Sequence, residues 1–181
     1  MEGTTMKLLS IDTNAKTSKN TKFGYLTGIL YLTPADKSGV NLCPMAELAG
    51  CKKPCLDTAG RGVFSNVQQA RLNRTKLFLN DQEGFMRQLV DEIGALSNKA
   101  KRLGIKAAVR LNGTSDIRFE NIKFSWFNKV QTIFDIFPNV QFYDYTKIPN
   151  RKNIPANYDL TFSYSGKKDF AKYNERAIKN G

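Results

Sequence analysis

Three cysteines within thirteen residues are the feature of this chain whose residue types and spacing best suit chemistry. Cys43, Cys51 and Cys55 follow the pattern Cys-x7-Cys-x3-Cys, and the sequence contains no other cysteine and no histidine. Thiolates are the usual protein ligands of iron–sulfur clusters, and each thiolate binds a different iron. Three thiolates from one segment therefore predict a [4Fe-4S] cluster with one iron left open.

The neighbours of these cysteines indicate a shaped loop. Pro44, Gly50 and Pro54 each stand directly beside a cysteine, and such residues fix turns and are poor in regular elements. An odd number of cysteines in a chain without a secretory signal also favours reduced thiols over a disulfide. The alternative is that the three cysteines are small buried hydrophobic residues.

Polar residues elsewhere complete the candidate site. Asp57 is a candidate fourth iron ligand, and the amides of Gly60-Arg61-Gly62 would donate to cluster sulfides or to an anion. Arg110 lies in an otherwise apolar stretch, so it must be paired or functional if buried, and Asp116 is a candidate partner or site carboxylate. The predicted cluster or anion pocket contains Gly60, Arg61, Gly62, Arg110, Asn112 and Asp116.

Other chemistries fit the composition less well. A structural zinc site usually has four protein ligands and no open position. Zinc would therefore need an aspartate such as Asp57 in addition to the three cysteines. Thiol-protease and serine-triad mechanisms usually need an imidazole base, which this chain lacks. The segment 57–62 has neither the lysine nor the spacing of a phosphate-binding loop.

Hydrophobic periodicity predicts alternating strands and helices. Aromatic and β-branched runs indicate strands, and apolar residues every three or four positions indicate helices. Ser65 to Gln68 has the pattern of a capping box, and Gly104 suits a helix C-terminus. The predicted strands are 23–32, 105–112, 140–145 and 159–164, and the predicted helices are 65–78, 81–103, 122–137 and 167–179.

This element order predicts an α/β fold with mainly parallel strands and right-handed crossovers. A full eight-unit barrel typically needs about 250 residues, so we expect a partial (half) β/α barrel, with a flavodoxin-like layered sheet as the alternative. The cysteine loop follows the first strand. We expect residues 1–22 to form a polar N-terminal arm and 23–181 a single domain, C-terminally truncated where a further strand would follow.

The layout brings the candidate residues to one edge of the sheet. The cysteine loop, the segment 112–116 and the segment 163–166 each follow a predicted strand. Since parallel strands end at a common edge, where α/β proteins carry their sites, the sequence predicts that these three segments converge.

Several short motifs surround the cysteines and follow the second predicted strand. They are Asn41-Leu42-Cys43-Pro44, Gly50-Cys51, Cys55-Leu56, Thr58-Ala59-Gly60-Arg61-Gly62, Gln68-Gln69-Ala70-Arg71 and Val109-Arg110-Leu111-Asn112-Gly113-Thr114-Ser115-Asp116. Together they resemble the motifs of a bacteriophage family similar to mycobacteriophage gene product eighty-eight. The resemblance runs from about residue 22 to residue 166, and it implies a virus-encoded protein that acts in the bacterial host.

The cysteine loop also looks like that of radical S-adenosylmethionine enzymes, whose three cysteines leave one iron for the methionyl group. That family's usual spacing is Cys-x3-Cys-x2-Cys, and Pro54 stands here where an aromatic residue is usual. We therefore predict an iron–sulfur protein with a redox or electron-transfer role, and S-adenosylmethionine as an alternative ligand. An enzymatic reaction would be that of an iron–sulfur oxidoreductase or of a radical enzyme of this kind.

The net charge of +12 suggests a second class of function. A basic surface attracts phosphate whatever the sequence, so the alternative is a nucleic-acid-binding phage protein whose cysteines are structural or bind zinc. The basic residues are spread along the chain and form no long run. No apolar stretch approaches the length of a membrane span, so we expect no membrane partner. The expected partner is an unknown redox partner or a small molecule, and the expected location is the host bacterial cytoplasm.

Overall fold

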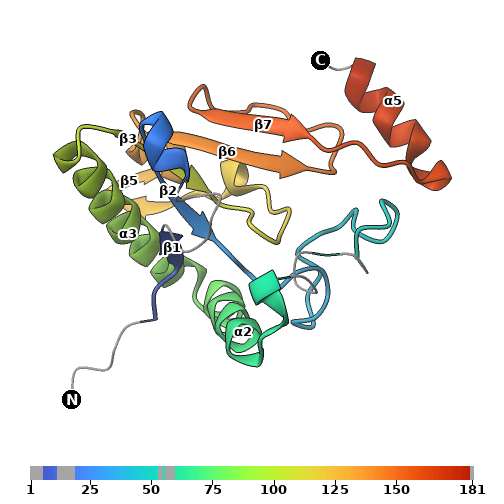
Figure 1. Ribbon diagram of the computed structural model, residues 1–181, viewed down its shortest axis with the longest axis horizontal. Helices are drawn as coiled ribbons and strands as arrows, with labels where there is room; N and C mark the ends of the chain where they lie inside the picture. Colours follow the sequence, from blue (N-terminus) through green and yellow to red (C-terminus); the bar gives the residue numbers. More distant parts are fainter. Residues whose placement is uncertain (1–5, 12–18, 53–54, 56–59, 180–181) are drawn as a thin grey trace.

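A five-stranded sheet forms the centre of the computed structural model, which describes residues 6–11, 19–52, 55 and 60–179. Four strands are parallel, and β1 pairs antiparallel with β2 at one edge. The protein is therefore a mixed α/β fold with a mostly parallel sheet (Figure 1). The strands, in spatial order, are β1 (Leu9–Ile11), β2 (Tyr25–Leu30), β3 (Lys106–Arg110), β6 (Gln141–Thr146) and β7 (Tyr158–Phe162).

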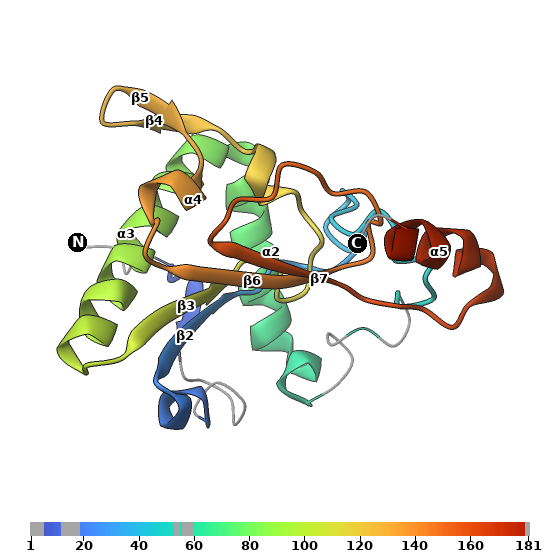
Figure 2. The ribbon, with the colours of Figure 1, turned by 90° about the horizontal axis from the view of Figure 1, so that it is seen from above.

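The helices and a small hairpin surround this sheet. Figure 2 shows α3, α4 and the β4–β5 hairpin on the same side of the sheet, whereas α5 lies beyond β7. Among the described residues, no helix is long and apolar enough to span a membrane. The helices are α2 (Ser65–Asn80), α3 (Gln82–Arg102), α4 (Ile133–Ile136) and α5 (Ala171–Lys179), and the hairpin strands are β4 (Phe124–Trp126) and β5 (Lys129–Gln131).

The apolar stripe of α3 forms the core with the sheet, as its periodicity predicts. Phe85, Leu89 and Ile93 on this helix are fully buried, and so are Leu30 on β2 and Val109 on β3. Full burial of one such side chain is worth about 1.5–3 kcal/mol. The core therefore fixes the parallel strands against α3 and with them the loops at their C-terminal ends.

The parallel strands follow one another in space in the same order as in the sequence. β2, β3, β6 and β7 lie side by side in that order. A flavodoxin-like sheet reverses its strand order part of the way across. The observed order has no such reversal among the described strands, so the flavodoxin-like alternative is wrong.

The helix predicted over 122–137 is wrong. The segment forms the β4–β5 hairpin and then the four-residue helix α4. Phe127 and Asn128 at the hairpin turn have φ values of 45° and 60°, which fits a tight turn between two strands. Phe124 and Trp126 are also spaced for one face of a strand, and so short an apolar pattern suits either element.

Two details at the start of the chain and of α2 also differ from the predictions. The stretch 1–22 was expected to lack regular structure, yet it contributes β1, because the Glu92 carboxylate on α3 accepts hydrogen bonds from the backbone amides of Leu8 and Leu9. Helix α2 begins after Phe64, and Ser65 makes no capping hydrogen bond; the Gln68 side chain donates to the Gly62 carbonyl instead.

Candidate functional site

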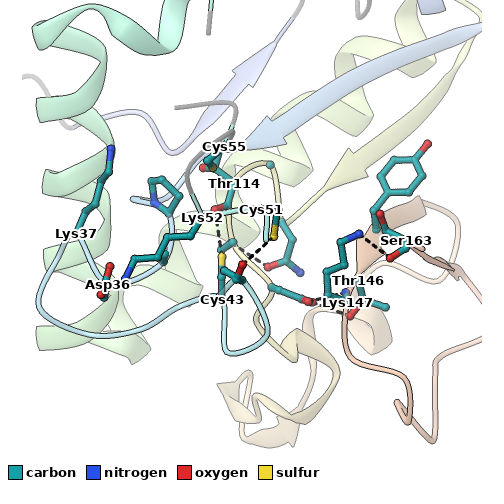
Figure 3. Close-up of a pocket in the computed structure, with 18 of the residues that line it drawn as sticks. Asp36, Lys37, Cys43, Cys51, Lys52, Cys55, Thr114, Thr146, Lys147 and Ser163 are labelled. Atoms are coloured by element: carbon teal, nitrogen blue, oxygen red, sulfur yellow. Dashed lines mark hydrogen bonds and ion pairs between the residues drawn. The ribbon is translucent and has the colours of Figure 1, made fainter. Parts of the chain in front are cut away.

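A cavity of about 410 Å³ lies at the edge of the sheet where the parallel strands end. All three cysteines line it, and so do three of the other predicted site residues, which come from the end of β3 and from the loop after it. Figure 3 shows Cys43, Cys51 and Cys55 on one side of Lys147, which donates a hydrogen bond to the Ser163 carbonyl on its other side. The cavity is lined by Pro34, Ala35, Asp36, Lys37, Cys43, Ala46, Cys51, Lys52, Cys55, Arg110, Asn112, Gly113, Thr114, Ser115, Asp116, Tyr145, Thr146, Lys147 and Ser163.

Turns and one glycine shape the loop that carries Cys43 and Cys51. The Cys51 amide donates to the Ala46 carbonyl at 3.0 Å, and the Cys43 amide donates to the Asn41 side chain at 2.9 Å. Gly50 has a φ of 67°, a conformation that residues with a Cβ rarely adopt. This positive φ explains why a glycine stands directly before Cys51.

The cysteine loop is joined to the loops that follow β3 and β7. The Leu42 carbonyl accepts from the Asp116 amide at 2.8 Å, and the Ala49 carbonyl accepts from the Ser165 hydroxyl at 2.8 Å. Segments far apart in the sequence are thus held at one place by buried hydrogen bonds. The cavity walls are fixed by the fold and not by the cysteine loop alone.

The thiols of Cys43 and Cys51 sit in surroundings that favour the neutral form. Burial raises the pKa of the Cys43 thiol to about 11. Burial also raises the pKa of the Cys51 thiol, although the nearby Lys147 ammonium lowers it in part. The Cys43 Sγ lies 3.5 Å from the Thr114 carbonyl oxygen, and the Cys51 Sγ lies 3.5 Å from that of Ala46. Because metal binding displaces thiol protons, a bound metal would supply the positive charge that the thiolates need here.

The loop after β3 is a rigid wall of the cavity. The Asn112 Oδ1 accepts from the Ser115 hydroxyl at 2.9 Å and from the Ile117 amide at 2.8 Å, so this side chain closes the loop on itself. Thr114 donates its hydroxyl hydrogen to the Leu32 carbonyl. The polar groups of this wall are therefore largely occupied in holding its own shape.

Asp116 is engaged with the chain after β6. Its two carboxylate oxygens accept from the Thr146 hydroxyl at 2.8 Å, the Lys147 amide at 2.8 Å and Arg151 Nη1 at 3.3 Å. Arg151 is nearly fully buried and also pairs with the Glu120 carboxylate. Asp116 thus lines the cavity as part of a buried ionic network, and burial raises the pKa of its carboxyl.

Arg110 pairs with Asp144 and not with Asp116, the partner suggested by the sequence. Its Nε lies 3.5 Å from Asp144 Oδ1, and its guanidinium carbon lies 5.3 Å from the centroid of the Tyr145 ring. The buried Nε of Arg110 has no hydrogen-bond partner among the described residues. The side chain remains 20% exposed at the cavity wall.

Lys147 is a cation of the site that the sequence reasoning missed. Its Nζ donates to the carbonyl oxygens of Ser163 and Tyr164, at 2.7 Å each. Burial lowers the pKa of this ammonium, whereas the nearby Cys51 and Asp116 act in the opposite direction. The residue directly follows β6, so the rule that sites gather at strand ends could have found it.

The remaining predicted site residues lie elsewhere or outside the described residues. Gly60, Arg61 and Gly62 form a short 3-10 helix before α2 and do not line the cavity. Asp57 lies outside the described residues. In the part of the chain that the structure describes, no three Cys, Asp or Glu side chains are grouped so that they could hold one metal ion.

Comparison with known proteins assigns the family. The sequence matches the family described as Gene product 88 over residues 6–181. The chain belongs to this family. It is the one that the motifs around the cysteines and after β3 resemble, so this prediction is confirmed. No curated protein and no solved structure matches the chain.

Proposed function

We propose that this protein binds a [4Fe-4S] cluster through Cys43, Cys51 and Cys55 and has a redox or electron-transfer role. The observation that carries the proposal is the presence of all three cysteines on the wall of one cavity of about 410 Å³. When bound, the cluster would take up and release single electrons. One iron would have no cysteine ligand from this chain, because the chain has three.

The surroundings of the cysteines fit this donor set. A cubane cluster binds each protein sulfur to a different iron, so it needs the sulfurs spread around it and not gathered on one ion. Lys147 lies near Cys51 and offsets part of the negative charge that three thiolates bring to the cavity. The hydrogen-bonded loops behind the cysteines would hold the ligands in place and limit the access of water.

The fourth iron would take a small molecule, water or the Asp57 carboxylate. A partial β/α barrel with the cysteine loop after its first parallel strand is the architecture that we propose, and the strand order β2-β3-β6-β7 supports it. This arrangement resembles that of radical S-adenosylmethionine proteins. S-adenosylmethionine is therefore an alternative ligand for the open iron, and its test is a titration of the reconstituted protein.

Single alanine variants test the ligand assignment. We expect anaerobically purified and reconstituted protein to hold about four irons and four sulfides per chain and to show a brown chromophore that bleaches on reduction. Cys43→Ala, Cys51→Ala and Cys55→Ala should each lower the iron content, because each removes the ligand of one iron. Leu48→Ala is the matched control, since this side chain is exposed in the same loop and does not line the cavity.

Three results would overturn the assignment. The first is full iron retention in all three cysteine variants. The second is a colourless wild-type protein that cannot be reconstituted, and the third is stoichiometric zinc in place of iron. Circular dichroism of each variant shows whether a loss of iron reflects a lost ligand or a lost fold.

A further inference from the structure

Arg110 is an arginine whose hydrogen-bonding capacity is largely unused. A guanidinium carries five N–H donors in a planar fork. The structure gives Arg110 an ion pair with Asp144 at 3.5 Å and a stacking contact with Tyr145, but no hydrogen bond to any described residue. Only its Nε–H, which faces Asp144, is buried without a hydrogen-bond partner among the described residues. The side chain is 20% exposed at the cavity wall, so an acceptor from outside the chain can reach the fork there.

The fork is also held in a fixed orientation. Arg110 is the last residue of β3, and the Asp144 carboxylate behind it accepts hydrogen bonds from the Leu111 and Asn112 amides and from the Tyr158 hydroxyl. Asp144 is therefore anchored by the backbone and holds the charge of Arg110 in place. A positioned fork binds an oxyanion with less loss of entropy than a mobile one.

Lys147 offers a second cation at the same cavity. Its ammonium has three donors, and two of them are given to the carbonyls of Ser163 and Tyr164. The centroid of the Phe170 ring lies 5.9 Å from Nζ, and Cys51 and Asp116 interact electrostatically with the ammonium. One donor thus remains for a ligand in the cavity that Lys147, Arg110 and the cysteines line.

We propose that the cysteine cavity binds a small molecule that carries a carboxylate or phosphate group, with Arg110 and Lys147 as its anion-binding residues. The planar fork of Arg110 suits two oxygens of such a group, and Lys147 adds a point charge. The cavity volume of about 410 Å³ lies in the range of small-molecule sites. The Tyr145 ring, half-exposed beside Arg110, gives the ligand an apolar surface next to its anionic group.

This inference rests on the proposed function in one respect, namely that the group beside the bound anion in this cavity is the iron–sulfur cluster. The donors themselves belong to the protein. Anion binding is therefore measurable both in the apoprotein and in the reconstituted protein, and failure of one proposal is distinguishable from failure of the other.

The experiment is isothermal titration of both forms with two separate probes, inorganic phosphate and succinate, in a buffer without other oxyanions. We expect saturable binding of at least one probe by the wild-type protein, and a loss of about tenfold or more in affinity for Arg110→Gln and for Lys147→Gln, as expected for a hydrogen bond to a charged group. Arg110→Lys should be intermediate, because it keeps the charge and loses the fork.

Lys106→Gln is the matched control, since Lys106 lies on the same strand as Arg110, is exposed and is absent from the cavity wall. It should bind the probes as the wild type does. Binding of phosphate alone assigns a phosphate-bearing ligand, and binding of succinate alone assigns a carboxylate. Absence of saturable binding by both forms, or equal affinities in the wild type and in well-folded Arg110→Gln and Lys147→Gln variants, would overturn the proposal whatever the iron content.

Discussion

Asp144 is almost fully buried, and its carboxylate accepts hydrogen bonds from two backbone amides and the Tyr158 hydroxyl. Burial nevertheless dominates and raises its pKa from 3.8 to about 6, although Arg110 acts in the opposite direction. The folded state therefore binds a proton in a pH range where the unfolded state has released it. The stability that this proton contributes is fully present below about pH 4 and is lost as the pH rises through about 6.

Replacing Asp144 by Asn should remove this pH dependence. As the pH rises from about 4 to about 7, the unfolding free energy of the wild type should fall by about 3 kcal/mol relative to that of Asp144→Asn. Urea unfolding of both proteins across this range measures it. Asp91→Asn, an exposed change on α3, is the control. A difference that stays constant, or that rises with pH, would contradict the assignment.

At the scale of elements, Glu92 fastens the edge strand β1 to helix α3. Its carboxylate accepts from the Leu8 amide at 2.8 and 3.0 Å and from the Leu9 amide at 2.7 Å. We expect Glu92→Ala to lower the unfolding free energy by about 2–3 kcal/mol, because it removes charge-assisted hydrogen bonds and leaves partly buried amides without acceptors.

Chemical denaturation and hydrogen exchange measure the effect of Glu92→Ala. The Leu8 and Leu9 amides should lose protection more than those of β3 do. The control is Glu83→Ala on the same helix, whose ion pair with Arg87 is exposed and should be worth less than about 0.5 kcal/mol. Equal losses for the two variants would show that Glu92 does not anchor β1.

The same elements show what the sequence could predict. The four parallel strands and α3 were predicted because their apolar residues follow one clear period, whereas α2 was predicted from the capping-box pattern at its start. The β4–β5 hairpin was missed because its apolar residues fit both a helical and a strand period over a short segment. Strand β1 was missed because its anchor, Glu92, is more than eighty residues away in the sequence.

The candidate site was predictable to a similar degree. The position of Cys43, Arg110 and Asp116 on one cavity follows from the rule that parallel strands end at a common edge. The ion pair between Arg110 and Asp144 was not predictable. It joins two neighbouring strands, and no pattern in the sequence reveals the register in which they pair. Tyr145 and Lys147 were missed although they stand at the end of a predicted strand and directly after β6, where the same strand-end rule applies.

At the scale of the whole molecule, the net charge of +12 predicts weak binding of nucleic acid that is independent of sequence. The basic residues are dispersed, so few of them reach one strand together. With about four phosphates neutralised, the affinity for single-stranded DNA should fall with a log–log slope of about −3 against salt concentration. Fluorescence anisotropy with two labelled oligonucleotides of unrelated sequence, from low to physiological salt, measures this slope.

Sub-micromolar binding that persists at physiological salt, or a clear preference for one sequence, would contradict this prediction. Nucleic acid would then be the main ligand, and the cysteines would have a structural role.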